Sequence, residues 1–182
     1  MIVYDTLGVT PGIDLIARLD DGTLLEDIFA ERLEKVLADY GFDGFHGPDC
    51  CGPGGMLAHN DYADNIIAQF VEYLGDRAPE ELKTPTGHVV AKLMPRAKLI
   101  WDQWRREWID FHCARWESCW SKIVAAARKH GCATMINSAN TKGAFEGLYQ
   151  FGIDYRAIAR LGVDYLVVET VAANMAQLYG GY

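Results

Sequence analysis

Residues 41–49 read Gly41-Phe42-Asp43-Gly44-Phe45-His46-Gly47-Pro48-Asp49, and this stretch decides the fold. It follows a helix-like run from Leu24 to Tyr40 and predicts a short buried strand that ends in a polar, turn-rich loop. A helix followed directly by a strand is typical of α/β proteins. In a β/α barrel, the catalytic groups come from the carboxyl ends of the strands. Asp49, at the end of this strand, is therefore the first candidate catalytic residue.

A second strand pattern, Asp164-Tyr165-Leu166-Val167-Val168-Glu169, repeats this arrangement 120 positions later and again ends in an acidic residue. A glutamate at the end of an apolar strand is costly to bury unless it is paired. Two carboxylates presented at the ends of two strands are the pattern with which most glycosidases cleave a glycosidic bond. We therefore expect Asp49 and Glu169 to act together as the catalytic pair.

Composition limits the classes of protein and partner. A chain of 182 residues with 50% hydrophobic content can bury a core, and we expect one domain over residues 1–182. The net charge of −8 argues against nucleic-acid or anionic-membrane partners, and no apolar stretch reaches the roughly 18 residues that span a bilayer. Five cysteines without framework spacing favour reduced thiols. The start shows no signal-peptide pattern, so a cytoplasmic location is slightly favoured while the localisation itself is left unassigned.

Strands and helices alternate along the chain, which predicts a parallel sheet. Strand patterns occupy residues 2–6, 41–47, 132–137 and 163–169, and helix patterns occupy residues 24–40, 61–74 and 154–161. A complete (β/α)₈ barrel needs roughly 200 to 250 residues. The predicted fold class is therefore α/β, a partial or incomplete TIM (β/α) barrel with parallel strands. Its exposed sheet edges are expected to allow self-association.

One stretch interrupts the alternation. Residues 75–95 contain three prolines and are predicted to form a loop or a set of short turns inserted into the barrel. One long helix is predicted after it, from about residue 96 to 130, and it carries all five tryptophans along one side. Large aromatic side chains at this spacing usually pack in the core. Trp101 and Trp104, nearest the loop, are the two that we expect to bind substrate by stacking on a sugar.

Side-chain alternation along the strands predicts which residues meet. Residues 133, 135 and 137 share one face, as do residues 165, 167 and 169, and as do residues 43, 45, 47 and 49. If each face points into the barrel, Asp49, Asn137 and Glu169 converge at one mouth. His46 and Asn140 lie next to these strand ends and are further candidates for hydrogen bonds to substrate.

Other readings of the same residues remain open. Asp49 precedes a Gly- and Pro-rich turn and could simply stabilise it. A histidine and cysteine cluster around residues 46–59 could be written as a zinc site, but it matches no standard ligand spacing. The sequence therefore predicts no metal and no cofactor.

Residues 40–49 resemble the strand motif of the glycoside hydrolase family that contains dextranases and cycloisomaltooligosaccharide glucanotransferases. Residues 135–140 are similar to the Asn-containing strand of that family, and residues 164–169 resemble its acid/base strand. The resemblance implies that Asp49 is the nucleophile, that Glu169 is the general acid/base, and that the substrate is a carbohydrate of the α-glucan type. It covers three short blocks of the chain.

The expected reaction is retaining hydrolysis, in which Asp49 attacks the anomeric carbon while Glu169 protonates the leaving oxygen and later activates water. Three alternatives remain open. One is a non-catalytic carbohydrate-binding or degenerate barrel fragment, and another is a metal-dependent barrel hydrolase. The third is that these residues are an excerpt of a larger enzyme and are inactive alone.

Overall fold

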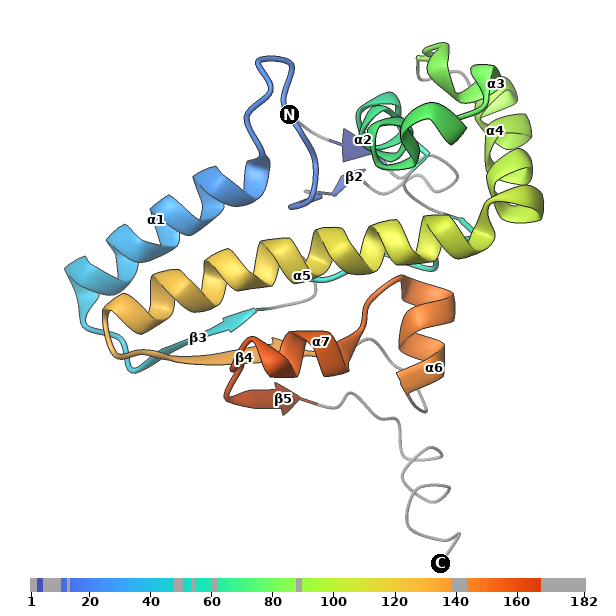
Figure 1. The fold of residues 1–182 in the computed structure, drawn as a ribbon. Helices are drawn as coiled ribbons and strands as arrows, with labels where there is room; N and C mark the ends of the chain where they lie inside the picture. Colours follow the sequence, from blue (N-terminus) through green and yellow to red (C-terminus); the bar gives the residue numbers. More distant parts are fainter. Residues whose placement is uncertain are drawn as a thin grey trace, which may run out of the picture.

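The computed structural model in Figure 1 describes residues 3–4, 11–12, 14–47, 51–53, 55–59, 62–87, 90–138 and 144–167. Its central feature is a three-stranded parallel sheet in the order β3-β4-β5. The strands are β3 (Gly44–Gly47), β4 (Ala133–Asn137) and β5 (Tyr165–Val167). The predicted mixed α/β class with parallel strands is confirmed. Parallel strands end at the same edge of a sheet, so the segments after β3, β4 and β5 all start there.

The first predicted strand, residues 2–6, does not join this sheet. Its described part is β1 (Val3–Tyr4), which pairs antiparallel with β2 (Pro11–Gly12) in a separate two-stranded sheet. The expectation of a parallel strand here is wrong for a geometric reason. Only residues 5–10 connect β1 to β2, whereas a parallel connection needs a dozen residues or more.

Helices make up most of the described chain. They are α1 (Leu25–Tyr40), α2 (Asp64–Leu74), α3 (Glu80–Lys83), α4 (Val90–Gln103), α5 (Arg105–Lys129), α6 (Ala144–Glu146) and α7 (Tyr155–Arg160), with a 3₁₀ turn η2 (Gly75–Arg77) and a π-helical segment η3 (Gly147–Phe151). The helices predicted over 24–40, 61–74 and 154–161 are confirmed within a few residues. Asp154 caps α7 as expected, because its carboxylate accepts a hydrogen bond from the Arg156 backbone N–H at 2.9 Å. None of the described helices is long and apolar enough to cross a membrane.

The prediction of a loop or a set of short turns over residues 75–95 is wrong at the end of this stretch. This stretch contains η2 and α3, and α4 already begins at Val90, so that Pro95 lies inside a helix. A proline in a helix removes one hydrogen bond to the carbonyl four residues earlier, here that of Ala91. Tertiary contacts of the next residue, Arg96, offset this loss. Its guanidinium is buried and donates to Asp64 at 2.7 Å and to the Thr84 carbonyl at 2.9 Å.

The predicted single helix over residues 96–130 is divided into two. α4 ends at Gln103 and α5 begins at Arg105, because Trp104 between them has φ −126° and ψ 19°, outside the helical region. The two helices therefore leave this residue in different directions, as Figure 1 shows. The break separates Trp101 from the tryptophans of α5.

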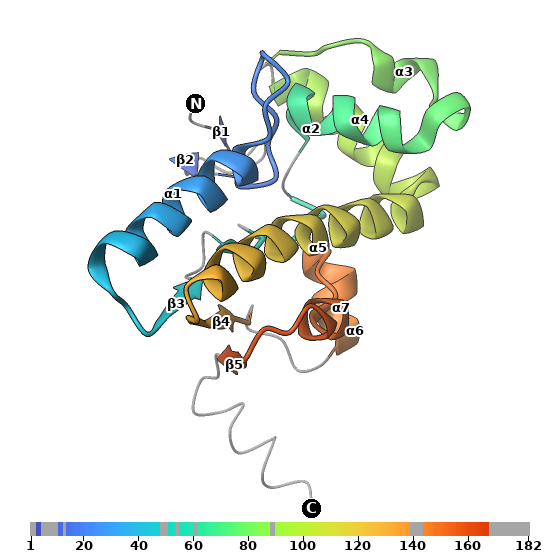
Figure 2. The same ribbon diagram turned by 60° about the vertical axis from the view of Figure 1, so that its left-hand side comes forward.

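The core lies where α5 crosses one face of the sheet, with α1 alongside it (Figures 1 and 2). Trp108, Trp116 and Trp120 of α5 are all fully buried, so the packing interpretation is confirmed for these three. On the sheet side, Ile136 of β4 is buried, and Phe45 of β3 packs edge-on against a phenylalanine of α1 at 5.9 Å. One face of the sheet is therefore covered by helices.

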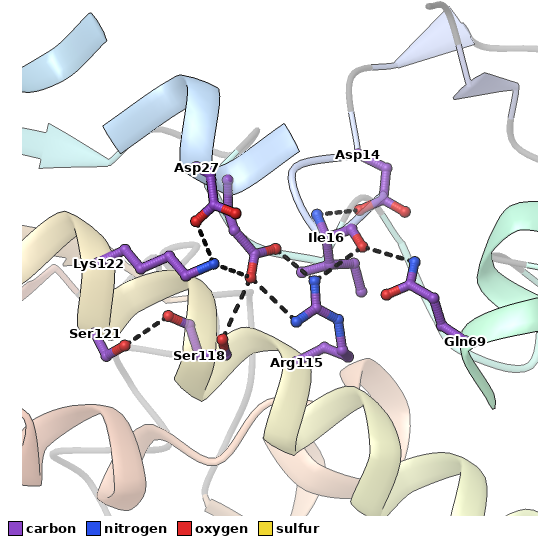
Figure 3. A network of polar contacts seen from close by, with 9 residues as sticks. Asp14, Ile16, Asp27, Gln69, Arg115, Ser118, Ser121 and Lys122 are labelled. Carbon is purple, nitrogen blue, oxygen red and sulfur yellow. Dashed lines mark hydrogen bonds and ion pairs between the residues drawn. The ribbon is translucent and has the colours of Figure 1, made fainter. Parts of the chain in front are cut away.

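A buried ionic network joins α1 to α5 (Figure 3). Glu26, in the first turn of α1, is fully buried. Its carboxylate accepts from Arg115 at 2.5 and 3.1 Å, from Lys122 at 3.1 Å and from Ser118 at 3.3 Å. All three donors belong to α5. A buried charge is tolerated only when it is paired in this way, and the network sets the position of α1 along α5.

Candidate active site at the carboxyl ends of the parallel strands

The strand register shows which side chains share the two faces of the sheet. His46 pairs with Met135, which pairs with Tyr165, and Asn137 pairs with Val167. Directly paired residues of neighbouring strands point to the same face. These five residues therefore share the face opposite to the helices, where His46 is exposed and Asn137 is half-buried. This face, at the carboxyl end of the strands, is the candidate active site.

The prediction of which side chains share the open face of the sheet is right for β4 and β5 and wrong for β3. Residues 135 and 137 do share a face with residues 165 and 167. Phe45 and Gly47, however, point to the helices: Phe45 contacts α1, and a Cβ on Gly47 would lie 2.7 Å from the Trp120 ring. The apolar side chains of β3 thus pack on the helical layer, which leaves His46 on the face of Asn137. From the strand spacing and rise, the Cα atoms of these two residues are about 8 Å apart.

Three predicted site residues lie outside the described residues. They are Asp49, Asn140 and Glu169. In the sequence, Asp49 comes two positions after the end of β3, Glu169 two positions after the end of β5, and Asn140 three positions after the end of β4. Their assignment as catalytic or substrate-binding residues stays a prediction.

Both neighbours of the segment that contains Asp49 are anchored on one tryptophan. Gly47, before it, leaves room for the Trp120 ring. Cys51, after it, is buried, and its carbonyl accepts a hydrogen bond from the Trp120 indole N–H at 2.9 Å. A buried indole N–H usually finds such a partner. Trp120 thereby fixes where the loop leaves the sheet and where it rejoins the core.

The loop after β3 also binds the segment after β4. Leu57 donates its backbone N–H to the carbonyl of Gln150 in η3 at 2.7 Å, and it accepts from the Tyr62 hydroxyl at 2.7 Å. The Leu57 side chain packs against Gly152, where a Cβ would lie 2.6 Å from it and where φ is +65°. Only glycine adopts this conformation readily. The loops at the ends of two neighbouring strands are therefore tied to each other.

Trp101 and Trp104 both remain half-buried and pack against the core. The Trp101 ring contacts Tyr149 edge-on at 5.8 Å, and the Arg105 guanidinium lies 5.1 Å from its centre. The Trp104 indole nitrogen is buried and has no acceptor among the described residues. Trp104 therefore packs mainly inside the protein, whereas Trp101 belongs to an aromatic group that reaches the surface.

Sequence reasoning missed two members of that group. Phe145 of α6 is 73% exposed, and its ring stacks on Tyr149 of η3 at 5.6 Å with an interplanar angle of 13°. Figure 1 shows α6 beyond the arrowheads of the strands, at the carboxyl end of the sheet. The signal was their spacing of four residues in a segment that follows a strand, since such residues share one side of a helix.

Nucleophilic cysteine and metal chemistry find little support in the described part of the chain. Burial raises the pKa of the Cys113 thiol to about 12, and burial also raises that of Cys119. A reactive cysteine needs a lowered pKa instead. The described residues contain no group of three or more side chains that could hold a metal ion.

Comparison of the chain with protein-family models, with curated proteins and with solved structures gave no match.

Proposed function

We propose that this protein is a glycoside hydrolase that cleaves α-glucans by a retaining two-carboxylate mechanism, on part of a β/α barrel. Asp49 is the nucleophile and Glu169 the general acid/base. His46 and Asn137, on the open face of the sheet, bind hydroxyl groups of the sugar. Asn140 and Trp101 contribute further contacts, and Trp104 supports the helix junction beside them.

One observation carries the proposal. β3 and β5 lie on either side of β4 and run parallel to it, and each is followed two positions later by an acidic residue. Parallel neighbours end at one edge, so the two acidic residues follow strands that are two spacings apart, or about 10 Å. A retaining enzyme needs its two carboxyls about 5 to 5.5 Å apart, and two acidic residues that follow strands at this spacing are the pattern on which the proposal rests.

The polar residues of the middle strand supply the next support. Asn137 is the last residue of β4, between the two acid-bearing strands, and an amide can both donate to and accept from sugar hydroxyls. His46 shares its face. A glycosidase gains several kcal/mol from hydrogen bonds to ring hydroxyls that strengthen in the transition state.

The test is hydrolysis of nitrophenyl α-glucosides and of dextran by the wild type, Asp49→Asn and Glu169→Gln. We expect Asp49→Asn to be inactive and Glu169→Gln to lose about 10²- to 10⁴-fold in kcat on substrates with poor leaving groups, as for loss of a general acid/base. NMR of the first product should show a retained anomer. If the first product is instead the inverted anomer, Asp49 acts as a general base and not as a nucleophile.

Asp43→Asn is the matched control. Asp43 is an exposed carboxylate on the same chain segment, but it lies at the amino end of β3. Its replacement should leave kcat/KM unchanged. Equal activity of the wild type, Asp49→Asn and Glu169→Gln would refute the proposed function.

A further inference from the structure

The described surface carries a group of side chains at the carboxyl end of the sheet, of which only Trp101 has a part in the function proposed above. It consists of Trp101, Arg105, Phe145 and Tyr149, and we call it the aromatic platform. Phe145 and Tyr149 stack almost parallel, Trp101 meets Tyr149 edge-on, and Arg105 lies over the Trp101 ring. Although the four residues come from α4, α5 and the α6–η3 segment, Tyr149 contacts both of the other rings.

Hydrogen bonds within the protein hold the aromatic platform in shape. Arg105 donates its Nε–H to the Trp101 carbonyl at 3.0 Å and a terminal N–H to the Tyr149 hydroxyl at 3.2 Å. The backbone of η3 is fixed in turn by the hydrogen bond from Leu57 to Gln150. A π-helical segment is rare and is often found at functional sites. The rings are therefore ordered before any ligand arrives, which lowers the entropic cost of binding.

The aromatic platform exposes one large apolar side chain to water. Phe145 leaves 73% of its surface in water, although burying a phenylalanine side chain stabilises a protein by about 1.5 to 3 kcal/mol. A flat, exposed ring face next to hydrogen-bond donors suits a ligand that is apolar on one face and rich in hydroxyls around its edge. A pyranose ring has this character, because its axial C–H groups form an apolar face.

The polar groups favour a neutral sugar. Two of the five guanidinium N–H groups of Arg105 are used within the platform, which leaves three for hydroxyl acceptors. The Arg105 charge already lies over the π-face of Trp101, and no carboxylate of the described residues pairs with it. The side chain is therefore held in position as a hydrogen-bond donor for hydroxyl groups.

We propose that the aromatic platform is a distal subsite that stacks one glucose ring of an α-glucan chain, outside the pair of rings at the cleaved bond. This inference rests on the proposed function for the nature of its ligand. It predicts that the enzyme distinguishes long chains from short ones, because only a long chain reaches both the carboxylates and the platform.

The test combines binding and hydrolysis with isomaltohexaose, and uses a nitrophenyl α-glucoside as the short substrate. Phe145→Ala should weaken isomaltohexaose binding, measured by calorimetry, by about tenfold, which corresponds to the loss of one aromatic contact. Tyr149→Phe keeps the ring and removes the acceptor for Arg105, so we expect a smaller loss. KM for the nitrophenyl glucoside should not change in either variant.

The chain offers a matched control pair. Tyr40 and Phe42 also stack, at 6.0 Å and 22°, and are 70% and 53% exposed. They lie at the amino end of β3, and no guanidinium of the described residues lies over either ring. Tyr40→Ala and Phe42→Ala should bind isomaltohexaose like the wild type.

The outcomes separate the two proposals. Tenfold weaker binding in Phe145→Ala together with no hydrolysis by the wild type would support the subsite and reject the hydrolase. Hydrolysis with an unchanged KM for isomaltohexaose in Phe145→Ala would reject the subsite and leave the hydrolase standing. A wild type that binds no isomaltohexaose would overturn the subsite.

Discussion

Replacement of Glu26 by alanine should destabilise the protein more than removal of any exposed carboxylate. Glu26 is fully buried, and the side chains of Arg115 and Lys122 are only 15% and 28% exposed. Loss of the carboxylate therefore leaves Arg115 without the carboxylate that it binds, whereas Lys122 keeps its ion pair with Asp27 at 2.5 Å. Breaking a buried ion pair from one side costs about 3 to 5 kcal/mol. Because both cations retain some access to water, we expect the lower limit, about 3 kcal/mol.

The loss can be measured by urea and thermal unfolding, followed by the fluorescence of the buried tryptophans. For a chain of this size, 1 kcal/mol corresponds to about 2 to 4 °C in Tm, so Glu26→Ala should lower Tm by about 6 to 12 °C. The value should change little with added salt, since buried pairs are weakly screened. A double variant, Glu26→Leu with Arg115→Leu, should be more stable than Glu26→Ala, because it leaves one fewer unpaired buried charge.

Glu72→Ala is the matched control. Glu72 receives two hydrogen bonds from Arg18, at 2.6 and 2.7 Å, but its side chain is 60% exposed. Exposed pairs contribute about 0 to 1 kcal/mol. If Glu26→Ala were no more destabilising than Glu72→Ala, the argument that burial makes the Glu26 network decisive would be refuted.

Burial lowers the pKa of His112 to about 3. Below about pH 6.5 the unfolded chain therefore binds a proton at this histidine, whereas the folded chain does not. The free energy of unfolding should then fall by up to about 1.4 kcal/mol per pH unit toward pH 3. Burial raises the pKa of Asp14 to about 6, so this residue has the opposite effect: the fold holds its proton more tightly, and stability falls as pH rises from about 4 to 6. In urea unfolding at several pH values, Asp14→Asn should therefore steepen the loss of stability in acid, and His112→Asn should remove or reverse it. Gly47→Ala should displace the Trp120 ring, which lies 2.7 Å from the new Cβ, and should lower kcat/KM as well as stability, by about 1 to 3 kcal/mol. Gly152→Ala should lower the urea midpoint further, because it combines a φ of +65° with a contact at 2.6 Å.

Gly22→Ala provides the baseline for both glycine variants. It has a φ of +88° but no atom within 4 Å of the added Cβ, so it measures conformational strain alone, about 1 kcal/mol. Gly152→Ala should exceed this value. A Gly47→Ala variant with wild-type stability and kcat/KM would show that Trp120 does not fix the loop before Asp49.

The sequence predicted the parallel sheet because its strands carry a local signal. Apolar runs such as residues 133–137, bounded by glycine and polar residues, fall between amphipathic helices, and this pattern does not depend on distant contacts. The helix from Leu25 to Tyr40 was equally readable, since its apolar residues recur at helical spacing and Gly41 ends it with a left-handed conformation.

What the sequence could not predict depended on tertiary contacts. Pro95 indicates a loop when read locally, yet the buried guanidinium of Arg96 bonds two distant segments and keeps the helix. The sequence does not show which face of β3 points to the helices, because this depends on the contacts of Phe45 with α1 and of Gly47 with Trp120. In the candidate site, His46 and Asn137 could be placed near each other from strand order, whereas the platform around Tyr149 depends on contacts between segments 44 residues apart.

The hydrogen bond between Leu57 and Gln150 has a consequence for how this protein could be altered. It joins two loops that arise from different strands, so their lengths are not independent. An insertion in one loop would pull on the other and shift the rings of η3. Any exchange of these loops with those of another protein, by recombination or by design, would have to transfer both together to preserve the surface that they form.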